Sequence, residues 1–285
     1  MTEAKSAVEE IGEGAREALE EVAEHPWMER LARFGYAAKG VVYIVVGILA
    51  LLADFGEGGD LTDTRGAMRT IELQPFGKII LSVVAAGLGA YVLWRWVQAA
   101  ADADNKGSDA KGLAIRTGYF FSGLVYAGLA FSAVRIVVDA SGDDRGNTIQ
   151  RWSGLFMTLP FGYLLVGFVG LCVIIFGLYQ IYKGYKAKFM KRIKLHEMSR
   201  RERWTLLSGR FGYAARGVVF CIVGSFLLQA AYHFNPSEAK GLDGVLQTLP
   251  RQTFGTLLLA IIAIGLIAYG LFALVEARYR RIAGQ

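Results

Sequence analysis

The residues best suited to chemistry in this chain are arginines and tyrosines that recur at fixed spacing within apolar sequence. Arg33, Tyr36, Gly40, Tyr43 and Gly47 follow one another at intervals of three or four residues, which places them on one face of a helix. A guanidinium group donates hydrogen bonds to anions, and a phenol both donates and accepts them. This face could therefore bind an anion or an anionic lipid head group.

The same face occurs three times along the chain. Its pattern is R-x-G-Y-x-x-x-G-x-V-[YF], and the copies begin at Arg33, Arg116 and Arg210. If each arginine lies at the membrane boundary, a helical rise of about 1.5 Å per residue places Lys39 roughly 9 Å deep. Cations of three copies that converge on one axis would form a basic vestibule. The candidate binding residues are Arg33, Tyr36, Lys39, Tyr43, Arg116, Tyr119, Tyr126, Arg210, Tyr213 and Arg216.

Helix packing within each hairpin is the alternative explanation of the pattern, and the glycines favour it. Small residues let helix backbones approach closely in lipid, where such packing drives much of the association. Tyrosines on the same strip could bond to the backbone that the glycines expose. The candidate packing residues are Gly35, Gly40, Gly47, Gly118, Gly123, Gly212, Gly217 and Gly224.

Residues that would support catalysis or metal binding are missing from the apolar runs. His25, His196 and His233 all lie outside these runs, and no Asp or Glu lies well inside one. Cys172 and Cys221 lie within apolar runs and are typical of small buried residues. We therefore predict that the protein is not an enzyme and has no cofactor and no metal. A proton-driven transporter is disfavoured for the same reason.

Long apolar runs position the repeated pattern. About 20 apolar residues are needed to cross roughly 30 Å of hydrocarbon. The second apolar run of each copy opens at a Phe-Gly pair preceded by proline, which is expected in the first turn of the helix. Fourteen residues after the glycine these runs carry Tyr91, Phe176 and Tyr269. Arg95, near the end of the first of them, is expected to reach the head groups. The predicted spans are 34–53, 77–99, 117–139, 162–183, 211–232 and 255–276.

These spans predict an all-α membrane protein with six transmembrane helices, arranged as three tandem hairpins with pseudo-threefold symmetry about the membrane normal. Most of the 31 Lys and Arg residues lie at the termini and between hairpins, so both termini are expected to be cytoplasmic. The predicted segments are an acidic cytoplasmic amphipathic helix at 1–26, hairpins at 27–102, 112–186 and 208–282, and a basic cytoplasmic link at 187–207.

The motif, the pairing of spans and the copy number resemble an uncharacterised bacterial membrane family, domain of unknown function 1206. Members of that family carry three copies of a two-helix repeat, and the resemblance covers residues 26–280. The chain departs from the pattern at Ser122, where the other copies have Lys39 and Arg216, at Phe220, and in an insertion after Pro250. The resemblance implies an architecture and a multi-pass location in the bacterial plasma (inner) membrane, but no activity.

Two functions remain open from the sequence. The favoured one is a non-catalytic scaffold or partner-binding membrane subunit, which would contact a protein partner through residues 1–25 and the basic link. The alternative is a channel or transporter for an ion or small anionic solute, or an anionic-lipid binder, with an axial site lined by the repeated motif. The net charge of +6 indicates contact with anionic lipid at the cytoplasmic face rather than with nucleic acid.

Overall fold

The computed structural model describes residues 14, 21, 25–54, 64–138, 148–187, 200–251 and 254–279, and within these ranges the chain is helical without strands. Six helices are long and apolar enough to cross a membrane, which confirms the prediction of an all-α protein with six spans. Most of the acidic helix predicted at 1–26 and most of the basic link predicted at 187–207 lie outside the described residues. The six are α2 (Pro26–Asp54), α4 (Gly77–Ala100), α5 (Ala110–Val137), α7 (Gly162–Tyr185), α8 (Arg200–Tyr232) and α10 (Gly255–Tyr279).

The second long helix of each copy begins after the same tight turn. Phe76, Phe161 and Phe254 all adopt the left-handed conformation, with φ near 60°. The glycine that follows lies against a carbonyl of the preceding segment, and a Cβ at Gly162 would lie 1.7 Å from the Phe156 oxygen. Short helices lead into these turns: α3 (Thr64–Glu72), α6 (Thr148–Met157), α9 (Leu242–Thr248) and two 3-10 turns, η2 (Pro236–Glu238) and η3 (Leu249–Arg251).

The sequence predicted that the prolines before these helices occupy the first helical turn. The structure places them before the helix instead. Pro75 and Pro160 lie in the turn itself, two residues before the helix starts, and Pro250 lies within η3. The left-handed phenylalanine stands between proline and helix in each copy. A left-handed residue cannot continue a right-handed helix, so the helix begins at the glycine rather than at the proline.

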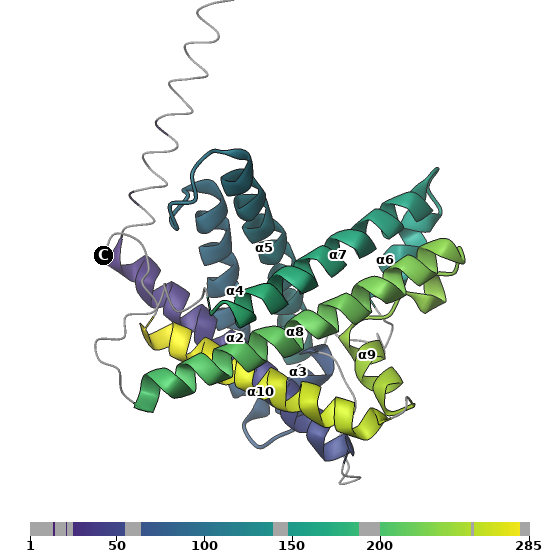
Figure 1. Cartoon of the computed structure of the whole chain (residues 1–285). Coiled ribbons are helices and arrows are strands. Elements are labelled where there is room, and N and C mark those ends of the chain that lie inside the picture. The colour runs from purple at the N-terminus through teal and green to yellow at the C-terminus, as the bar shows by residue number, and fades with distance from the viewer. Residues whose placement is uncertain are drawn as a thin grey trace, which may run out of the picture.

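Helices pack mainly between neighbouring copies. The second helix of one copy lies along the first helix of the next in the pairs α4–α5 and α7–α8, and α10 returns to lie along α2 (Figure 1). Within copies, α2 packs against α4 and α8 packs against α10. The last copy is thereby joined to the first.

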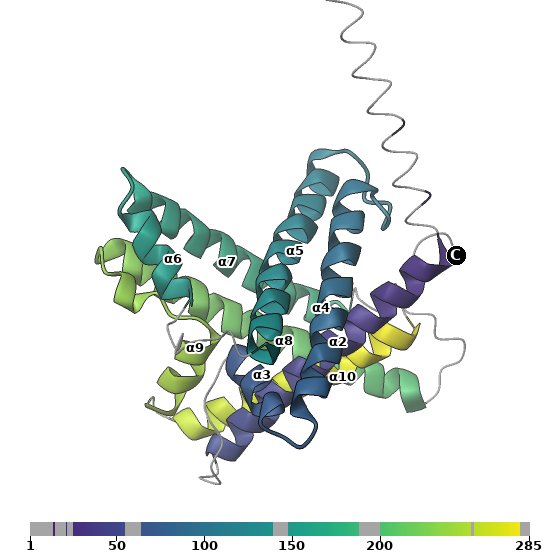
Figure 2. The same cartoon turned by 180° about the vertical axis from the view of Figure 1, so that it is seen from behind.

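The second copy departs from this arrangement. Within the described ranges, α5 and α7 are not a closely packed pair. Figures 1 and 2 show the α4–α5 pair and the α7–α8 pair leaving the α2–α10 pair in different directions. The structure therefore contains two packed hairpins, in the first and third copies, and one open hairpin in the second.

The glycine strip packs partly within and partly between copies, whereas the hairpin hypothesis placed all of it within a copy. Gly35 and Gly212 do pack within their own hairpins, against Tyr91 and Tyr269. The deeper glycines pack between copies. A Cβ at Gly40 would lie 2.8 Å from the Gly270 oxygen of α10, and one at Gly217 would lie 2.6 Å from the Gly177 oxygen of α7. Gly47 and Gly224 continue the same two contacts along α2 and α8, and Gly123 lies against Trp96 of α4. Backbones at this separation gain dispersion contacts that larger side chains would prevent.

Candidate functional site: a tyrosine–cation cluster

Lys39 lies at the centre of the helices, surrounded by tyrosines. Its side chain is 2% exposed. The ammonium nitrogen lies 4.8 to 5.9 Å from the ring centroids of Tyr36, Tyr91, Tyr126 and Tyr269, which come from four different helices. It donates hydrogen bonds to the hydroxyl oxygens of Tyr269 at 2.6 Å and Tyr91 at 3.4 Å. Each such cation–ring contact contributes about 0.5–2 kcal/mol, depending on desolvation.

Arg216 of α8 reaches the same hydroxyl group from the other side. Its Nη1 donates to the Tyr269 oxygen, and its guanidinium carbon lies 5.4 Å from the ring centre of Tyr43 and 5.0 Å from that of Phe220. Its Nε is buried and has no hydrogen-bond partner among the described residues. Equivalent cations of the first and third copies thus meet on one phenol.

The phenols form a continuous group across four helices. The hydroxyl oxygens of Tyr43 and Tyr126 lie 3.4 Å apart. Ring contacts join Tyr91 to Tyr126 with centroids 4.6 Å apart, and Tyr43 to Tyr269 with centroids 4.9 Å apart. We refer below to Lys39, Arg216, Tyr43, Tyr91, Tyr126 and Tyr269 as the tyrosine–cation cluster.

Arg95 adds a third cation at the edge of the cluster. Its Nε donates to the Tyr91 hydroxyl at 2.8 Å, and its Nη1 donates to Gln98 Oε1 at 2.9 Å. This contradicts the expectation that Arg95 extends to the head groups. The residue lies one turn after Tyr91 on α4, so its guanidinium folds back onto that ring, 4.8 Å from its centre.

Arg33 lies at a helix end rather than in the cluster. Its Nη1 donates to the carbonyl oxygens of Ala277 and Arg278, in the last turn of α10, and Glu29 accepts from its Nε at 2.9 Å. The final carbonyls of a helix lack intrahelical partners and carry partial negative charge. Arg33 therefore satisfies the end of α10 and ties it to α2.

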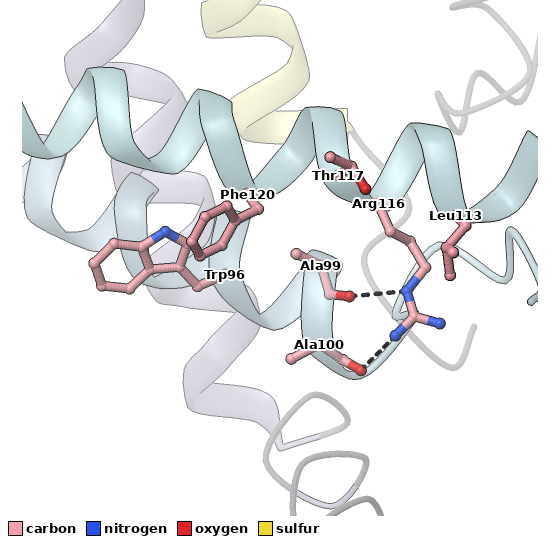
Figure 3. A pocket seen from close by; sticks show the side chains of 7 residues that line it. All are labelled: Trp96, Ala99, Ala100, Leu113, Arg116, Thr117 and Phe120. Carbon is pink, nitrogen blue, oxygen red and sulfur yellow. Dashed lines mark hydrogen bonds between the residues drawn. The ribbon is translucent and has the colours of Figure 1, made fainter. Parts of the chain in front are cut away.

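Arg116 does the same for α4. Its Nε and Nη2 donate to the carbonyl oxygens of Ala99 and Ala100, each at 2.8 Å (Figure 3). Beside it is a shallow, mostly apolar groove of about 380 Å³ between the ends of α4 and α5. The groove is lined by Trp96, Ala99, Ala100, Leu113, Arg116, Thr117 and Phe120.

The other predicted residues lie apart from one another. Tyr119 donates to Asp104 at 2.8 Å, Tyr213 accepts from Lys183 at 2.8 Å, and Arg210 is exposed. Tyr213 still touches the cluster, with its ring 5.5 Å from that of Tyr269. The structure thus brings Tyr36, Lys39, Tyr43, Tyr126 and Arg216 together and places Arg33 and Arg116 at helix ends.

Sequence reasoning missed two of the central residues, Tyr91 and Tyr269. A signal for them was present, because aromatic residues stand at the same position in the second helix of every copy. Which helix they face depends on packing between copies, and the local pattern carries no information on that.

The cluster contains more hydrogen-bond donors than acceptors. The Tyr269 oxygen accepts from Lys39 and Arg216, and the Tyr91 oxygen accepts from Lys39 and Arg95. A phenolic oxygen engaged in this way still has its own proton to donate. Fixed donors and positive charge at one point are the arrangement that binds an anion. Among the described residues, no group of His, Cys, Asp and Glu could hold a metal ion.

Known proteins match the chain over almost its whole length. The model of a family described as a domain of unknown function, DUF1206, matches residues 34–102, 117–187 and 211–280. An uncharacterised protein of Bacillus subtilis (strain 168), YxxB, is 36% identical over 258 residues, which cover 90% of this chain and 93% of the relative. No solved structure matches the chain. The protein is a multi-pass membrane protein with three copies of this repeat, and it belongs to the DUF1206 family.

Proposed function

We propose that the protein is an integral membrane channel or transporter for a small anion, with the tyrosine–cation cluster as its binding site. The observation that carries this proposal is the meeting of Lys39 and Arg216 on the hydroxyl of Tyr269. Both cations lie along membrane-spanning helices, where a charge costs about 2.5–3.5 kcal/mol on insertion scales. An anion held between them would offset part of that cost.

The repulsion between the two cations supports the same conclusion. Their nitrogens lie 2.6 and 2.5 Å from one oxygen, so they are at most about 5 Å apart. Two like charges at about 5 Å repel by about 3 kcal/mol at an effective dielectric constant of about 20. Glu276 of α10 is buried two turns along the helix from Tyr269 and acts electrostatically on that phenol, so it offsets part of this repulsion. A bound anion would offset more of it.

Packing alone is a weaker account of the cluster. Tyrosines and glycines suffice to bring these helices together, but apolar residues of similar size would pack equally well without the cost of desolvating two charges. The scaffold hypothesis depends on residues 1–25 and on the basic link, which lie largely outside the described residues, so it stays a prediction. The absence of catalysis stays a prediction as well.

The orientation in the membrane is part of the proposal. The distribution of Lys and Arg supports cytoplasmic termini in the inner membrane. The common order of the α4–α5, α7–α8 and α10–α2 pairs supports a pseudo-threefold arrangement about the membrane normal, from which the second copy departs. The cluster lies where these pairs meet.

Anion flux in proteoliposomes tests the proposal. Vesicles loaded with chloride, phosphate or sulfate should release at least one of these anions when the purified protein is present. Lys39→Met and Arg216→Met should each lower the flux about tenfold or more, because each removes a charged donor worth at least about 1.4 kcal/mol. Lys78→Met, at the exposed start of α4, is the matched control and should leave it unchanged. Absence of flux with the unchanged protein, or full flux in both cluster variants, would overturn the proposal.

A further inference from the structure

In the first copy and in the third, the two helices pack closely at an alanine of the first helix and a glycine of the second. A Cβ at Gly87 of α4 would lie 2.4 Å from the Cβ of Ala38, and a Cβ at Gly265 of α10 would lie 2.1 Å from that of Ala215. The helices of these two hairpins therefore touch at a point where neither residue has a side chain longer than a methyl group.

The second copy has larger residues at both of these positions. Phe121 replaces the alanine and Cys172 replaces the glycine. Together they add eight heavy atoms where the other copies have backbone contact, so α5 and α7 cannot approach in the same way. A Cβ added at Gly118, another glycine of the motif, would accordingly have no atom of the described residues within 4 Å. The sequence itself holds this hairpin open.

Two side chains of α5 and α7 are more exposed than the residues at the same repeat positions in the first and third copies. Val125 of α5 is 64% exposed, whereas its equivalents Val42 and Val219 are 2% and 6% exposed. Phe176 of α7 is 45% exposed, although its equivalents are the buried tyrosines of the cluster. We call the open region the α5–α7 seam and define it by Gly118, Phe121 and Val125 on α5 and Val169, Cys172 and Phe176 on α7.

The inner side of the α5–α7 seam is the tyrosine–cation cluster. From α5, the Tyr126 hydroxyl contacts that of Tyr43, whose ring lies 5.4 Å from the Arg216 guanidinium. From α7, the Phe176 ring lies 5.2 Å from the ring of Phe220, which in turn lies 5.0 Å from Arg216. Tyr43, Arg216 and Phe220 are partly exposed, in contrast to the fully buried centre of the cluster. The partly exposed residues beside Arg216 thus contact α5 through Tyr126 and α7 through Phe176.

We propose that the α5–α7 seam admits an anionic lipid from the bilayer, with its head group at Arg216 and its acyl chain along the apolar residues of the seam. This inference rests on the proposed anion site and names its ligand as an amphiphile with a phosphate or carboxylate head. The buried Nε of Arg216 and the phenols of Tyr43 and Tyr126 supply donors for the head group. Phe121, Val125 and Phe176 supply the apolar surface for the chain.

The walls of the α5–α7 seam favour a lipid over a free ion as the species that enters by this route, and they leave open the passage of a small anion along the axis. A hydrated inorganic anion would have to lose its water against apolar side chains before it reached Arg216, and those side chains return no hydrogen bond. An amphiphile exchanges one hydrocarbon surface for another along the same path. Ser122 stands where the other copies carry a cation, so α5 adds no charge at that position.

Photolabelling in bilayers tests this inference. The full chain is reconstituted in phosphatidylcholine vesicles that contain a trace of phosphatidic acid with a diazirine in its acyl chain. Label should concentrate in peptides of α5 and α7. It should fall about tenfold or more in Arg216→Gln, since loss of a charge-assisted bond costs at least about 1.4 kcal/mol. Arg216→Lys, which keeps the charge, should retain most of it. Phosphatidylcholine with the same diazirine should show no such preference.

A second pair of variants tests the α5–α7 seam without touching the cluster. Phe121→Ala combined with Cys172→Gly restores the alanine–glycine pair, should let the hairpin close, and should reduce labelling of α5 and α7 to the level of phosphatidylcholine. Phe131→Ala combined with Leu171→Ala removes exposed apolar side chains from the same two helices and is the matched control.

Four results would overturn the inference. Equal labelling by the two photolipids would show that these faces meet bulk lipid only. Full competition by inorganic phosphate, with anion flux intact, would identify a free ion as the ligand and leave the proposed function standing. Cross-links between two chains at the α5–α7 seam would identify a second copy as the occupant. Loss of both lipid labelling and anion flux in the unchanged protein would remove the proposed function as well.

Discussion

Three glycines at the same position of the three repeats should respond differently to alanine. A Cβ at Gly35 would lie 2.6 Å from the backbone nitrogen of Tyr91, and one at Gly212 would lie 2.5 Å from that of Tyr269. At Gly118 an added Cβ would lie more than 4 Å from every atom that the structure describes beyond its own helix turn. The three variants therefore make the same chemical change in two closed hairpins and one open hairpin.

The size of the difference follows from two opposing effects. Alanine favours an α-helix over glycine by about 1 kcal/mol. At Gly35 and Gly212 the new methyl group must push two helix backbones apart by nearly 1 Å, and overpacking of this kind costs about 1–3 kcal/mol or more. Gly118→Ala should therefore be neutral or stabilise the protein by up to about 1 kcal/mol, whereas the other two should destabilise it by a net amount of up to about 2 kcal/mol or more.

Unfolding by sodium dodecyl sulfate in mixed micelles, followed by tryptophan fluorescence, measures these free energies. Leucine at the same positions provides a stronger version, in which the two closed hairpins should fail and the open one should tolerate the change. If Gly118→Ala destabilised the protein as much as Gly35→Ala, then α5 and α7 would pack together as the other hairpins do. The α5–α7 seam and lipid access through it would both be refuted.

Other variants test the cluster and the helix ends. Tyr269→Phe should destabilise the protein by about 2–4 kcal/mol in the same titration, because Lys39 and Arg216 lose the hydroxyl that accepts from both. Tyr43→Phe should cost about 1 kcal/mol. Similar losses of stability in the two variants would contradict the proposed hydrogen bonding. Arg116→Ala should cost about 1–2 kcal/mol and speed hydrogen exchange near the start of α5, and unchanged exchange there would contradict its role at the end of α4. Gly162→Ala should cost about 3 kcal/mol or more, because its Cβ would clash with the Phe156 carbonyl, and a normal yield of folded protein in size-exclusion chromatography would argue against the turn described.

The helices and their number were predictable because apolar runs of membrane length carry that information directly. Helix starts were less predictable: α2 and α5 begin at Pro26 and Ala110, well before the apolar sequence does. The polar residues there continue the helix, and at α5 the Asp109 side chain accepts from the backbone of Gly112 and marks its start. Hydropathy reports the width of the hydrocarbon, whereas capping determines where a helix begins.

The site was less predictable because it depends on which helices pair. The pattern at Gly40 and Gly47 fits a partner in the same copy and one in the preceding copy equally well, since all second helices resemble one another. Packing against the preceding copy is what brings Tyr269 of α10 to Lys39 of α2, 230 positions apart. Arg33 and Arg116 were read as site residues because they begin the motif, yet the unpaired carbonyls that attract them belong to another copy.

The second copy shows how a repeat can acquire a binding site by losing the small residues that let its two helices pack together. Its motif keeps Gly118 and Tyr126 but carries Phe121 where alanine would allow contact and Ser122 where a cation would stand. With an alanine–glycine pair, Phe176 would be buried as its equivalents are, and the partly exposed side of Arg216 would be covered by α7. With a further cation in place of Ser122, repulsion in the cluster would grow while the number of acceptors stayed the same. Both changes therefore act in one direction, since they leave Arg216 accessible to an anion through the open hairpin.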